Sequence, residues 1–361
     1  MKKILTIIGA RPQFIKASVV SRAIIETSSL QEVVVHTGQH FDSNMSAIFF
    51  HQLSIPEPSY LLDINRGNHG DMTGRMLIEI EEKILKEKPD FVMVYGDTNS
   101  TLAGALAASK LHIPVIHIEA GLRSFNMNMP EEINRILTDR VSDLLFCPTQ
   151  TAINNLKNES FPYLTPRNKL QTIALVGDVM QDCACLFSNQ ALAPQSVDPS
   201  IENFILVTIH RAENTDDPHR LSEIFRALTQ LSYSHLLVIP LHPRTRKFIE
   251  LTGIDTSNLR IIDPVGYLEM LWLLSKSSLI LTDSGGVQKE AFFMGKPCVT
   301  MRDQTEWIEL IEAGANELVG ANSELIIDAV KRNFGRSVSD PNNLYGGGTA
   351  SNKIVETILE A

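Results

Sequence analysis

Short apolar runs alternate with longer amphipathic stretches along most of the chain, and this alternation limits the possible folds more than any other feature. Short runs rich in Val, Ile and Leu are typical of strands that are buried on both faces. The stretches between them have the length and pattern of helices. Because strands that alternate with helices form parallel sheets with helices on both faces, the sequence predicts an α/β protein.

The expected strands fall into two series. In the first half of the chain we expect strands at residues 3–8, 32–37, 91–95, 115–118 and 144–147. In the second half we expect strands at residues 204–208, 236–240, 259–262, 279–282 and 298–301. A polar passage with two prolines, Asn158 to Lys169, separates the series, and 361 residues exceed what one hydrophobic core usually fills. We therefore expect two Rossmann-like domains, residues 1–168 and 169–349, whose parallel sheets face a central cleft.

Charge and cysteine usage narrow the possible partners. A formal net charge of -10 without an evident basic run argues against nucleic-acid binding. The four cysteines include no CxxC pair, so they indicate neither a zinc site nor a disulfide framework and fit a reducing compartment. The apolar run after Met1 stops at Gly9 without a cleavage-like site, and no later run is long enough to cross a bilayer. We expect a cytoplasmic protein that binds no membrane.

The strand at residues 279–282 leads directly into Ser284-Gly285-Gly286 and then into a helix. A helix start has backbone N–H groups without intrahelical partners and a partial positive charge, and glycines let an anion approach closely. Glu290, about a turn and a half into that helix, has a carboxylate that suits ribose hydroxyls better than phosphate. The pattern predicts a site for a nucleoside diphosphate, while a tight turn without a ligand remains the alternative.

Three carboxylates are expected at one edge of the first sheet. Asp97 and Glu119 follow neighbouring apolar strands, and Glu131 lies in the first turn of a helix that Pro130 opens, with Arg135 four residues later. Acids that converge on a cleft can hold different protonation states and so act as acid and base. Each also has a structural interpretation: a helix cap for Asp97, pairing with a nearby arginine for Glu119, and a favourable helix dipole for Glu131.

Several cations follow strands on the same side. Arg11 and Lys16 flank the first strand-to-helix connection. The planar guanidinium group of arginine and the ammonium group of lysine can each bind phosphate or carboxylate there. His210 ends a strand, and a protonated imidazole there would stabilise a departing phosphate oxygen, although a lone histidine is more often structural. His242 follows the next strand. No GxGxxG follows the first strand and the acids form no evident metal cluster, so we expect neither a cofactor nor a metal.

In this order, the motifs resemble those of the non-hydrolysing UDP-N-acetylglucosamine 2-epimerases. The resemblance covers nearly the whole chain and rests on Gly9-Ala-Arg-Pro-Gln-Phe-Ile-Lys16, Thr37-Gly-Gln-His40, Gly96-Asp-Thr98, His117-Ile-Glu-Ala-Gly-Leu-Arg123, Pro130-Glu-Glu-Ile-Asn-Arg135, Val207-Thr-Ile-His-Arg211, His242-Pro243 and Thr282-Asp-Ser-Gly-Gly286. It implies a GT-B-like pair of domains, a homodimer without NAD or metal, and a final helix, residues 350–361, that returns to the first domain.

The resemblance also implies a mechanism. Members of the family couple loss of the C2 proton to departure of UDP from C1, and then add UDP back with a proton delivered to the other face. Asp97, Glu119 and Glu131 match the family's catalytic acids. His210 completes the expected catalytic set, because it would hold the diphosphate as it separates. The remaining matched positions would hold the UDP-sugar, with Glu290 on the ribose: Arg11, Lys16, Arg135, His242, Ser284, Gly285 and Gly286.

Departures from the common pattern indicate the substrate. Gln13-Phe14 stands where Glu-Ala is usual, Trp307 where arginine is usual, and residues 41–44 differ from the usual allosteric sequence. These changes resemble the branch that acts on UDP-2,3-diacetamido-2,3-dideoxyglucuronate in surface-polysaccharide synthesis. Gln13, Phe14 and Trp307 are expected to line the sugar pocket, with Arg123 or Arg302 pairing the sugar carboxylate.

Other functions stay open from the sequence alone. UDP-N-acetylglucosamine itself is the alternative substrate, and a GT-B glycosyltransferase would share the diphosphate site. A UDP-sugar sensor would need the nucleotide site without the acids, and a hydrolysing epimerase would release free sugar.

Overall fold

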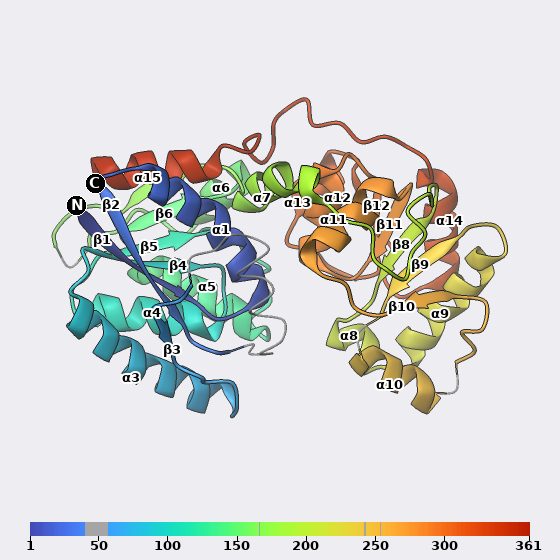
Figure 1. Cartoon of the computed structure of the whole chain (residues 1–361), viewed down its shortest axis with the longest axis horizontal. Helices are drawn as coiled ribbons and strands as arrows, with labels where there is room; N and C mark the ends of the chain where they lie inside the picture. The colour runs from blue at the N-terminus through green and yellow to red at the C-terminus, as the bar shows by residue number, and fades with distance from the viewer. Residues whose placement is uncertain (40–56, 166, 242, 253) are drawn as a thin grey trace. The chain divides into compact units, whose positions relative to one another are not determined.

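The chain forms two compact α/β units, which Figure 1 shows. The computed structural model describes residues 1–39, 57–165, 167–241, 243–252 and 254–361. The first unit contains residues 1–183 and 343–361, and the second contains residues 184–342.

The first unit is built on a seven-stranded parallel sheet with the order β3-β2-β1-β4-β5-β6-β7. Its elements are β1 (Lys2–Ile8), α1 (Arg11–Glu26), β2 (Leu30–His36), β3 (Tyr60–Leu61), α3 (His69–Glu87), β4 (Phe91–Tyr95), α4 (Asn99–Lys110), β5 (Val115–Ile118), α5 (Pro130–Val141), β6 (Leu144–Cys147), α6 (Gln150–Asn158), β7 (Thr172–Leu175), the first part of α7 (Val179–Phe187) and α15 (Ala350–Glu360).

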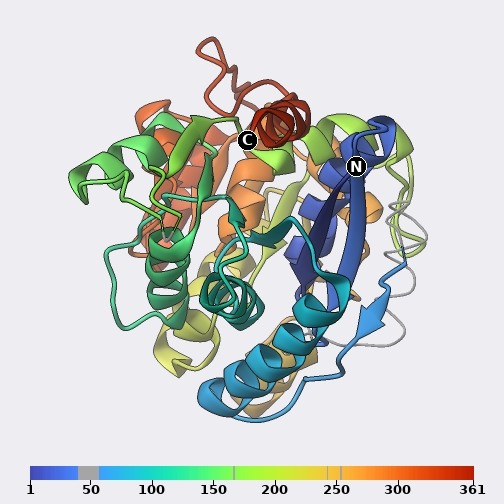
Figure 2. The same ribbon diagram turned by 90° about the vertical axis from the view of Figure 1, so that its left-hand side faces the viewer.

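Helices cover both faces of this sheet. Alternate strand residues such as Leu5, Ile7 and Val94 pack with the apolar sides of α3 and α4, which form a core with Met76 and Ile80. Figures 1 and 2 show α15 and α3 on opposite sides of the sheet. Such burial on both faces explains why the central strands are almost wholly apolar.

Helix α15 packs against α1 and brings the end of the chain beside its beginning. The Lys2 side chain donates from Nζ to the carbonyl oxygens of Ile358, at 3.4 Å, and Leu359, at 3.3 Å. The apolar residues Ile354, Val355 and Ile358 of α15 are buried. The last helix is thus part of the first unit.

The second unit has a six-stranded parallel sheet with the order β10-β9-β8-β11-β12-β13. Its elements are the end of α7, η1 (Ser188–Gln190), β8 (Ile205–Thr208), α8 (Ala212–Thr215), α9 (Pro218–Ser232), β9 (Leu237–Pro240), α10 (Pro243–Thr252), β10 (Arg260–Ile262), α11 (Tyr267–Lys276), β11 (Leu279–Thr282), α12 (Gly285–Phe293), β12 (Cys298–Thr300), α13 (Ile308–Glu312), β13 (Asn316–Leu318) and α14 (Ser323–Asn333).

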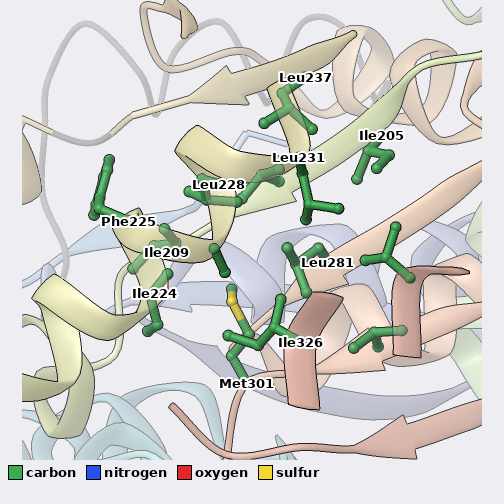
Figure 3. Packing of buried hydrophobic residues seen from close by; sticks show 14 of the residues in the cluster. Ile205, Ile209, Ile224, Phe225, Leu228, Leu231, Leu237, Leu281, Met301 and Ile326 are labelled. Carbon is green, nitrogen blue, oxygen red and sulfur yellow. The ribbon is translucent and has the colours of Figure 1, made fainter. Parts of the chain in front are cut away.

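Figure 3 shows the core of the second unit. Phe225 and Leu228 of α9 pack with Ile326 of α14 against strand residues such as Ile205 and Leu281. Burial of a Leu, Ile or Phe side chain contributes roughly 1.5–3 kcal/mol, so this layer fixes the sheet on which the loops beyond β8 and β11 are mounted.

The expected α/β class with two Rossmann-like units is confirmed. The division between the units differs from the expected one, because the first unit continues to Cys183 instead of ending at residue 168. Strand β7 lies beyond the polar passage 158–169 and pairs with β6, so that passage is a loop within the first unit.

Candidate functional site

Each sheet reverses its strand order at one point, and the expected site residues follow the strands at that point. In the first sheet β1 lies beside β4, and in the second sheet β8 lies beside β11. Arg11 and Asp97 follow β1 and β4, whereas His210 and Ser284 follow β8 and β11. Loops diverge at such a switch point, and ligands of open α/β sheets bind there. Strand order gives this independent reason to look for a site in each unit.

Asp97 lies directly beyond β4 and is held by two residues of α5. Arg135 Nη2 donates to Asp97 Oδ2, and the Asp97 side chain is 31% exposed against 7% for Arg135. Asn134 Nδ2 donates to the backbone carbonyl of Asp97 at 2.8 Å. Helix α5 thus fixes the backbone and the carboxylate of Asp97 while part of the carboxyl group stays accessible.

Glu119, beyond β5, forms a second pair with Lys16 of α1. Lys16 Nζ donates to Glu119 Oε2, and the two side chains are 11% and 8% exposed. A Cβ placed on Gly96 would lie 3.2 Å from Glu119 Oε2 and 3.7 Å from Lys16 Nζ. This pair therefore lies against the turn that precedes Asp97, so two of the three expected acids and two of the expected cations share one neighbourhood.

The third expected acid, Glu131, is exposed in the first turn of α5. Arg135 pairs instead with Glu132, which is only 1% exposed and accepts from the N–H groups of Ser124 at 2.9 Å and Phe125 at 2.8 Å. Burial acts to raise the pKa of Glu132, but these hydrogen bonds and the charge of Arg135 outweigh it and hold the pKa below its ordinary value. Glu132 is a structural acid that the sequence analysis missed.

Gln13 connects the two loops at the switch point of the first sheet. Its Oε1 accepts from the N–H of Gly9 at 2.8 Å and of Ala10 at 3.0 Å. Its Nε2 donates to the carbonyl of Tyr95 at 2.8 Å and to Thr98 Oγ1 at 3.0 Å. Because Gln13 is 2% exposed and its amide is used inside the unit, it is an internal link and does not fit the expected pocket wall.

The other side chains expected around the sugar are also engaged within the protein. Phe14 is 2% exposed and Trp307 is 4% exposed. Arg123 Nη1 donates to Asp139 Oδ2 at 2.7 Å, and its side chain is 1% exposed. Arg302 pairs through Nη1 with Glu306 at 3.0 Å. The structure therefore does not support Arg123 or Arg302 as a free partner for a sugar carboxylate.

In the second unit, Ser284 is the N-cap of α12 and accepts from the N–H of Val287 at 3.5 Å. Among the residues that the structure describes, a Cβ on Gly286 would have only Ser284 Oγ nearby, at 4.0 Å, whereas a Cβ on Gly285 would overlap Glu306 Oε1. The helix start is thus open at Gly286 and closely approached by a carboxylate at Gly285.

Glu306 therefore already places an anionic group at the start of α12, where the sequence predicted a diphosphate. Burial acts to raise its pKa, but the charges of Arg302 and Arg211 and the backbone N–H of Glu306 outweigh this effect and lower the pKa. The location shows that α12 accepts negative charge at its N-terminus. The sequence did not mark Glu306, because its contact with Gly285 depends on the fold of the loop after β12.

His210 lies on the turn after β8, with its side chain 49% exposed. Its Nδ1 lies 3.4 Å from Asp283 Oδ1. Asp283 is fully buried and accepts from the N–H groups of His210, at 3.1 Å, and Arg211, at 3.0 Å. A ring whose Nδ1 faces a carboxylate presents Nε2 to solvent, so Asp283, which the sequence analysis missed, orients His210.

The other expected binding residues differ in how far the structure describes them. Glu290 lies in α12 and is 6% exposed. Arg11 is the first residue of α1. His242 and residues 41–44 lie outside the described residues.

Two features of the described residues bear on the class of site. In that part of the chain, no group of three or more His, Cys, Asp and Glu side chains is arranged to hold a metal ion. Likewise, none of the described helices has the length and apolar composition needed to cross a membrane.

The fold and the two switch-point sites define an α/β protein of the GT-B-like class. The family model of UDP-N-acetylglucosamine 2-epimerase matches residues 22–359, and the chain belongs to this family of isomerases. The family expected from the motifs is thus confirmed.

Three relatives define its place in the family. The chain is 64% identical over 359 residues, 99% of each protein, to the UDP-2,3-diacetamido-2,3-dideoxy-D-glucuronate 2-epimerase of Pseudomonas aeruginosa. It matches the crystal structure of the Methanocaldococcus jannaschii UDP-GlcNAc 2-epimerase in complex with UDP-GlcNAc and UDP, with a TM-score of 0.88 and 43% identity over 100% of both chains. It also matches the Neisseria meningitidis enzyme bound to UDP-GlcNAc, with a TM-score of 0.88 and 33% identity over 99% of this chain and 100% of that one.

Proposed function

We propose that this protein is a non-hydrolysing 2-epimerase that converts UDP-2,3-diacetamido-2,3-dideoxyglucuronate into its manno epimer. The observation that carries the proposal is the 64% identity, over 99% of both chains, to the Pseudomonas aeruginosa enzyme named for that substrate. UDP-N-acetylglucosamine is the second candidate, because the structural relatives at 43% and 33% identity bind it.

The proposed reaction has two balanced steps. In the first, a base removes the proton from C2 while the bond between C1 and the UDP oxygen breaks, which leaves a double bond between C1 and C2. In the second, an acid delivers a proton to the opposite face of C2 while the UDP oxygen attacks C1. Hydrogen leaves and returns at C2 as a proton and no hydride is transferred, so neither step calls for NAD.

Asp97, Glu119 and Glu131 are the proposed acid and base groups. The pairs Asp97 with Arg135 and Glu119 with Lys16 support this assignment, since each places a proton-accepting carboxylate next to a cation at the switch point of the first sheet. Such cations can stabilise the diphosphate or the carboxylate of the substrate during the reaction. Glu131 is exposed, so it is free to approach a bound sugar.

The second unit supplies the proposed diphosphate site. An anion at α12 would accept hydrogen bonds from backbone N–H groups at Gly285 and Gly286 and from the Ser284 hydroxyl. His210 would stabilise the negative charge that develops on the leaving UDP oxygen, and Glu290 would accept hydrogen bonds from the ribose. Arg11 and His242 complete the proposed set on the strength of their motifs.

We further propose that the protein works as a homodimer in the cytoplasm and supplies sugars for surface polysaccharides such as lipopolysaccharide O-antigen. The sequence has four cysteines without a CxxC pair, which supports a reducing compartment. The homodimer rests on the family resemblance. Light scattering on purified protein at several concentrations tests it, and a mass of one chain at every concentration contradicts it.

Side-by-side kcat/KM measurements test the substrate. We expect epimer formation from each UDP-sugar alone, with a higher kcat/KM on UDP-2,3-diacetamido-2,3-dideoxyglucuronate than on UDP-N-acetylglucosamine. Equal or better activity on UDP-N-acetylglucosamine would refute the proposed substrate but would still agree with the proposed epimerisation. Free sugar as the product would refute the non-hydrolysing reaction.

A further inference from the structure

Helix α5 buries its polar side and exposes apolar residues, which is the reverse of an ordinary surface helix. Ile133 and Leu137 are each 41% exposed, whereas Glu132, Arg135 and Asp139 are at most 7% exposed. The buried residues lie at spacings of three and four, on one side of the helix. Burial of charged groups is costly unless they are paired, so this side of α5 has a specific role.

Asp139 is at the centre of this polar side and is fully buried. Its Oδ1 lies 2.7 Å from Nδ1 of His117, which belongs to β5. Its Oδ2 accepts from the N–H of Gly121 at 3.1 Å and from Arg123 Nη1 at 2.7 Å. Burial acts to raise the pKa of Asp139, but His117 and Arg123 outweigh it and lower the pKa, so the carboxyl group is ionised.

His117 extends this contact to the turn after β4. Its Nε2 lies 2.8 Å from the carbonyl oxygen of Gly96. A carbonyl oxygen and an ionised carboxylate both accept hydrogen bonds, so both ring nitrogens of His117 face acceptors. Asp139 and His117 thus form a buried hydrogen-bonded chain that reaches the residue immediately before Asp97.

The two oxygens of Asp139 therefore hold the two turns that carry the proposed proton-transfer groups. Oδ1 acts through His117 on Gly96, next to Asp97, and Oδ2 accepts from the N–H of Gly121, two residues after Glu119. These turns have left-handed backbone at Gly96 (φ +62°), Gly121 (φ +80°) and Glu119 (φ +74°). A non-glycine residue such as Glu119 adopts that conformation only where its surroundings enforce it.

We infer that Asp139, acting with His117, is a positioning residue that sets the distance and direction of Asp97 and Glu119 relative to each other and to α5. The inference rests on the proposed function of these acids. Asp139 touches no substrate in this account and acts only through the turns. Since a displacement near 1 Å at a reacting group can cost about 10²-fold in rate, its loss should affect the chemical step more than the binding of UDP.

The chain provides a matched control in Asp143. It is 7% exposed, accepts from the N–H of Val115 at 2.8 Å and pairs with Arg167. Val115 begins β5, whereas Glu119 follows the end of the same strand. Asp143 is therefore a buried carboxylate with an arginine and a backbone N–H as partners, but it acts at the opposite end of β5 from the acids.

The experiment compares Asp139→Asn with Asp143→Asn in the full-length protein. For each we measure the midpoint of urea unfolding, the Kd of UDP, kcat, and the isotope effect on turnover of substrate deuterated at C2. We expect both variants to lose stability. Asp139→Asn alone should lower kcat roughly 10- to 100-fold, keep the Kd of UDP within about twofold, and raise the C2 isotope effect. A purely structural defect lowers the active fraction but leaves the isotope effect unchanged.

His117 gives a second, milder pair of variants in case Asp139→Asn does not fold. Glutamine can place an amide donor where His117 Nε2 lies, so His117→Gln should retain a higher kcat than His117→Ala. Equal rates for these two variants, or a kcat and isotope effect for Asp139→Asn that match those of Asp143→Asn, would overturn the inference.

Reference variants separate this inference from the proposed function. If Asp97→Asn and Glu119→Gln are inactive while Asp139→Asn behaves like Asp143→Asn, the positioning role alone fails. If Asp97→Asn and Glu119→Gln keep full activity, the assignment of these residues as acid and base is refuted. The positioning role of Asp139 is then refuted as well.

Discussion

Acid should destabilise this protein through His36 at pH values where most carboxylates are still ionised. His36 ends β2, is 1% exposed, and stacks on Phe14 with a ring-centroid distance of 4.7 Å. The N–H of Gly38 donates to His36 Nδ1 at 2.8 Å, which requires a ring nitrogen without a proton. Burial lowers the pKa of His36 from 6.5 to about 4.

The direction of the effect follows from these two pKa values. Between pH 6.5 and about 4 the unfolded chain binds a proton at residue 36 that the folded chain excludes. The stabilisation is therefore complete above pH 6.5 and is lost progressively as the pH falls to about 4. The gap of about 2.5 pH units, at about 1.4 kcal/mol per unit, corresponds to about 3 kcal/mol, of which about 2 kcal/mol is lost by pH 5.

Urea denaturation at pH 7.5 and pH 5 measures this loss. We compare wild type with His36→Asn, in which the amide oxygen can accept from Gly38 and does not titrate. His112→Asn is the control, because His112 is exposed and has φ +60°, which asparagine tolerates. The fall in unfolding free energy between the two pH values should be about 2 kcal/mol smaller in His36→Asn and unchanged in His112→Asn. The same fall in His36→Asn as in wild type would refute the reasoning.

Three further predictions concern the proposed site. Conversion of the acids to amides (Asp97→Asn, Glu119→Gln, Glu131→Gln) should each lower kcat by roughly 10²-fold or more and leave the Kd of UDP nearly unchanged by calorimetry; three amides near full activity would make the acids structural. Gly285→Ala should lower the melting temperature, since its methyl group would displace the ion-paired Glu306. Gly286→Ala should have the melting temperature of wild type or a higher one. Equal melting temperatures for the two variants would contradict this packing. His210→Asn should lower kcat more than it raises KM in steady-state kinetics, because the charge on UDP develops as the bond to C1 breaks; a higher KM with unchanged kcat would make His210 a simple binding residue.

The buried strands and the edge strand β10 could be read from the sequence, whereas the edge strands β3, β7 and β13 could not. The structure has β4, β5, β6 and β11 at the expected residues, because these strands lie inside the sheets, are buried throughout and are largely apolar. Strand β7 lies in the short apolar run Ile173 to Val176, but Thr172 and Leu175 are exposed, so the strand is not buried on both faces. The sequence analysis did not include it among the strands, and for that reason the unit boundary was expected too early; its pairing with β6 places it in the first unit.

The positions of the site residues followed from the sequence, whereas their partners did not. Polar residues after parallel strands share one edge of the sheet, which brings Asp97 and Glu119 into one neighbourhood. Which of Glu131 and Glu132 is buried depends on the rotation of α5 about its axis. If the apolar residues of that helix are assumed to face inward, the wrong side of the helix is predicted to be buried. Gln13 and Glu306 make contacts that are distant in sequence, which local patterns do not encode. Gln13 links the loop after β1 to the end of β4, and Glu306, in the loop after β12, approaches the start of α12.

The most direct test of the account is the fate of hydrogen at C2. We incubate the purified protein with the UDP-sugar in deuterated water, without NAD and with a chelator, and follow C2 by NMR. Elimination and re-addition predict an equilibrium mixture of both epimers, in which deuterium replaces hydrogen at C2. Epimerisation that leaves C2 unlabelled, or that starts only when NAD or a metal is added, would contradict the account.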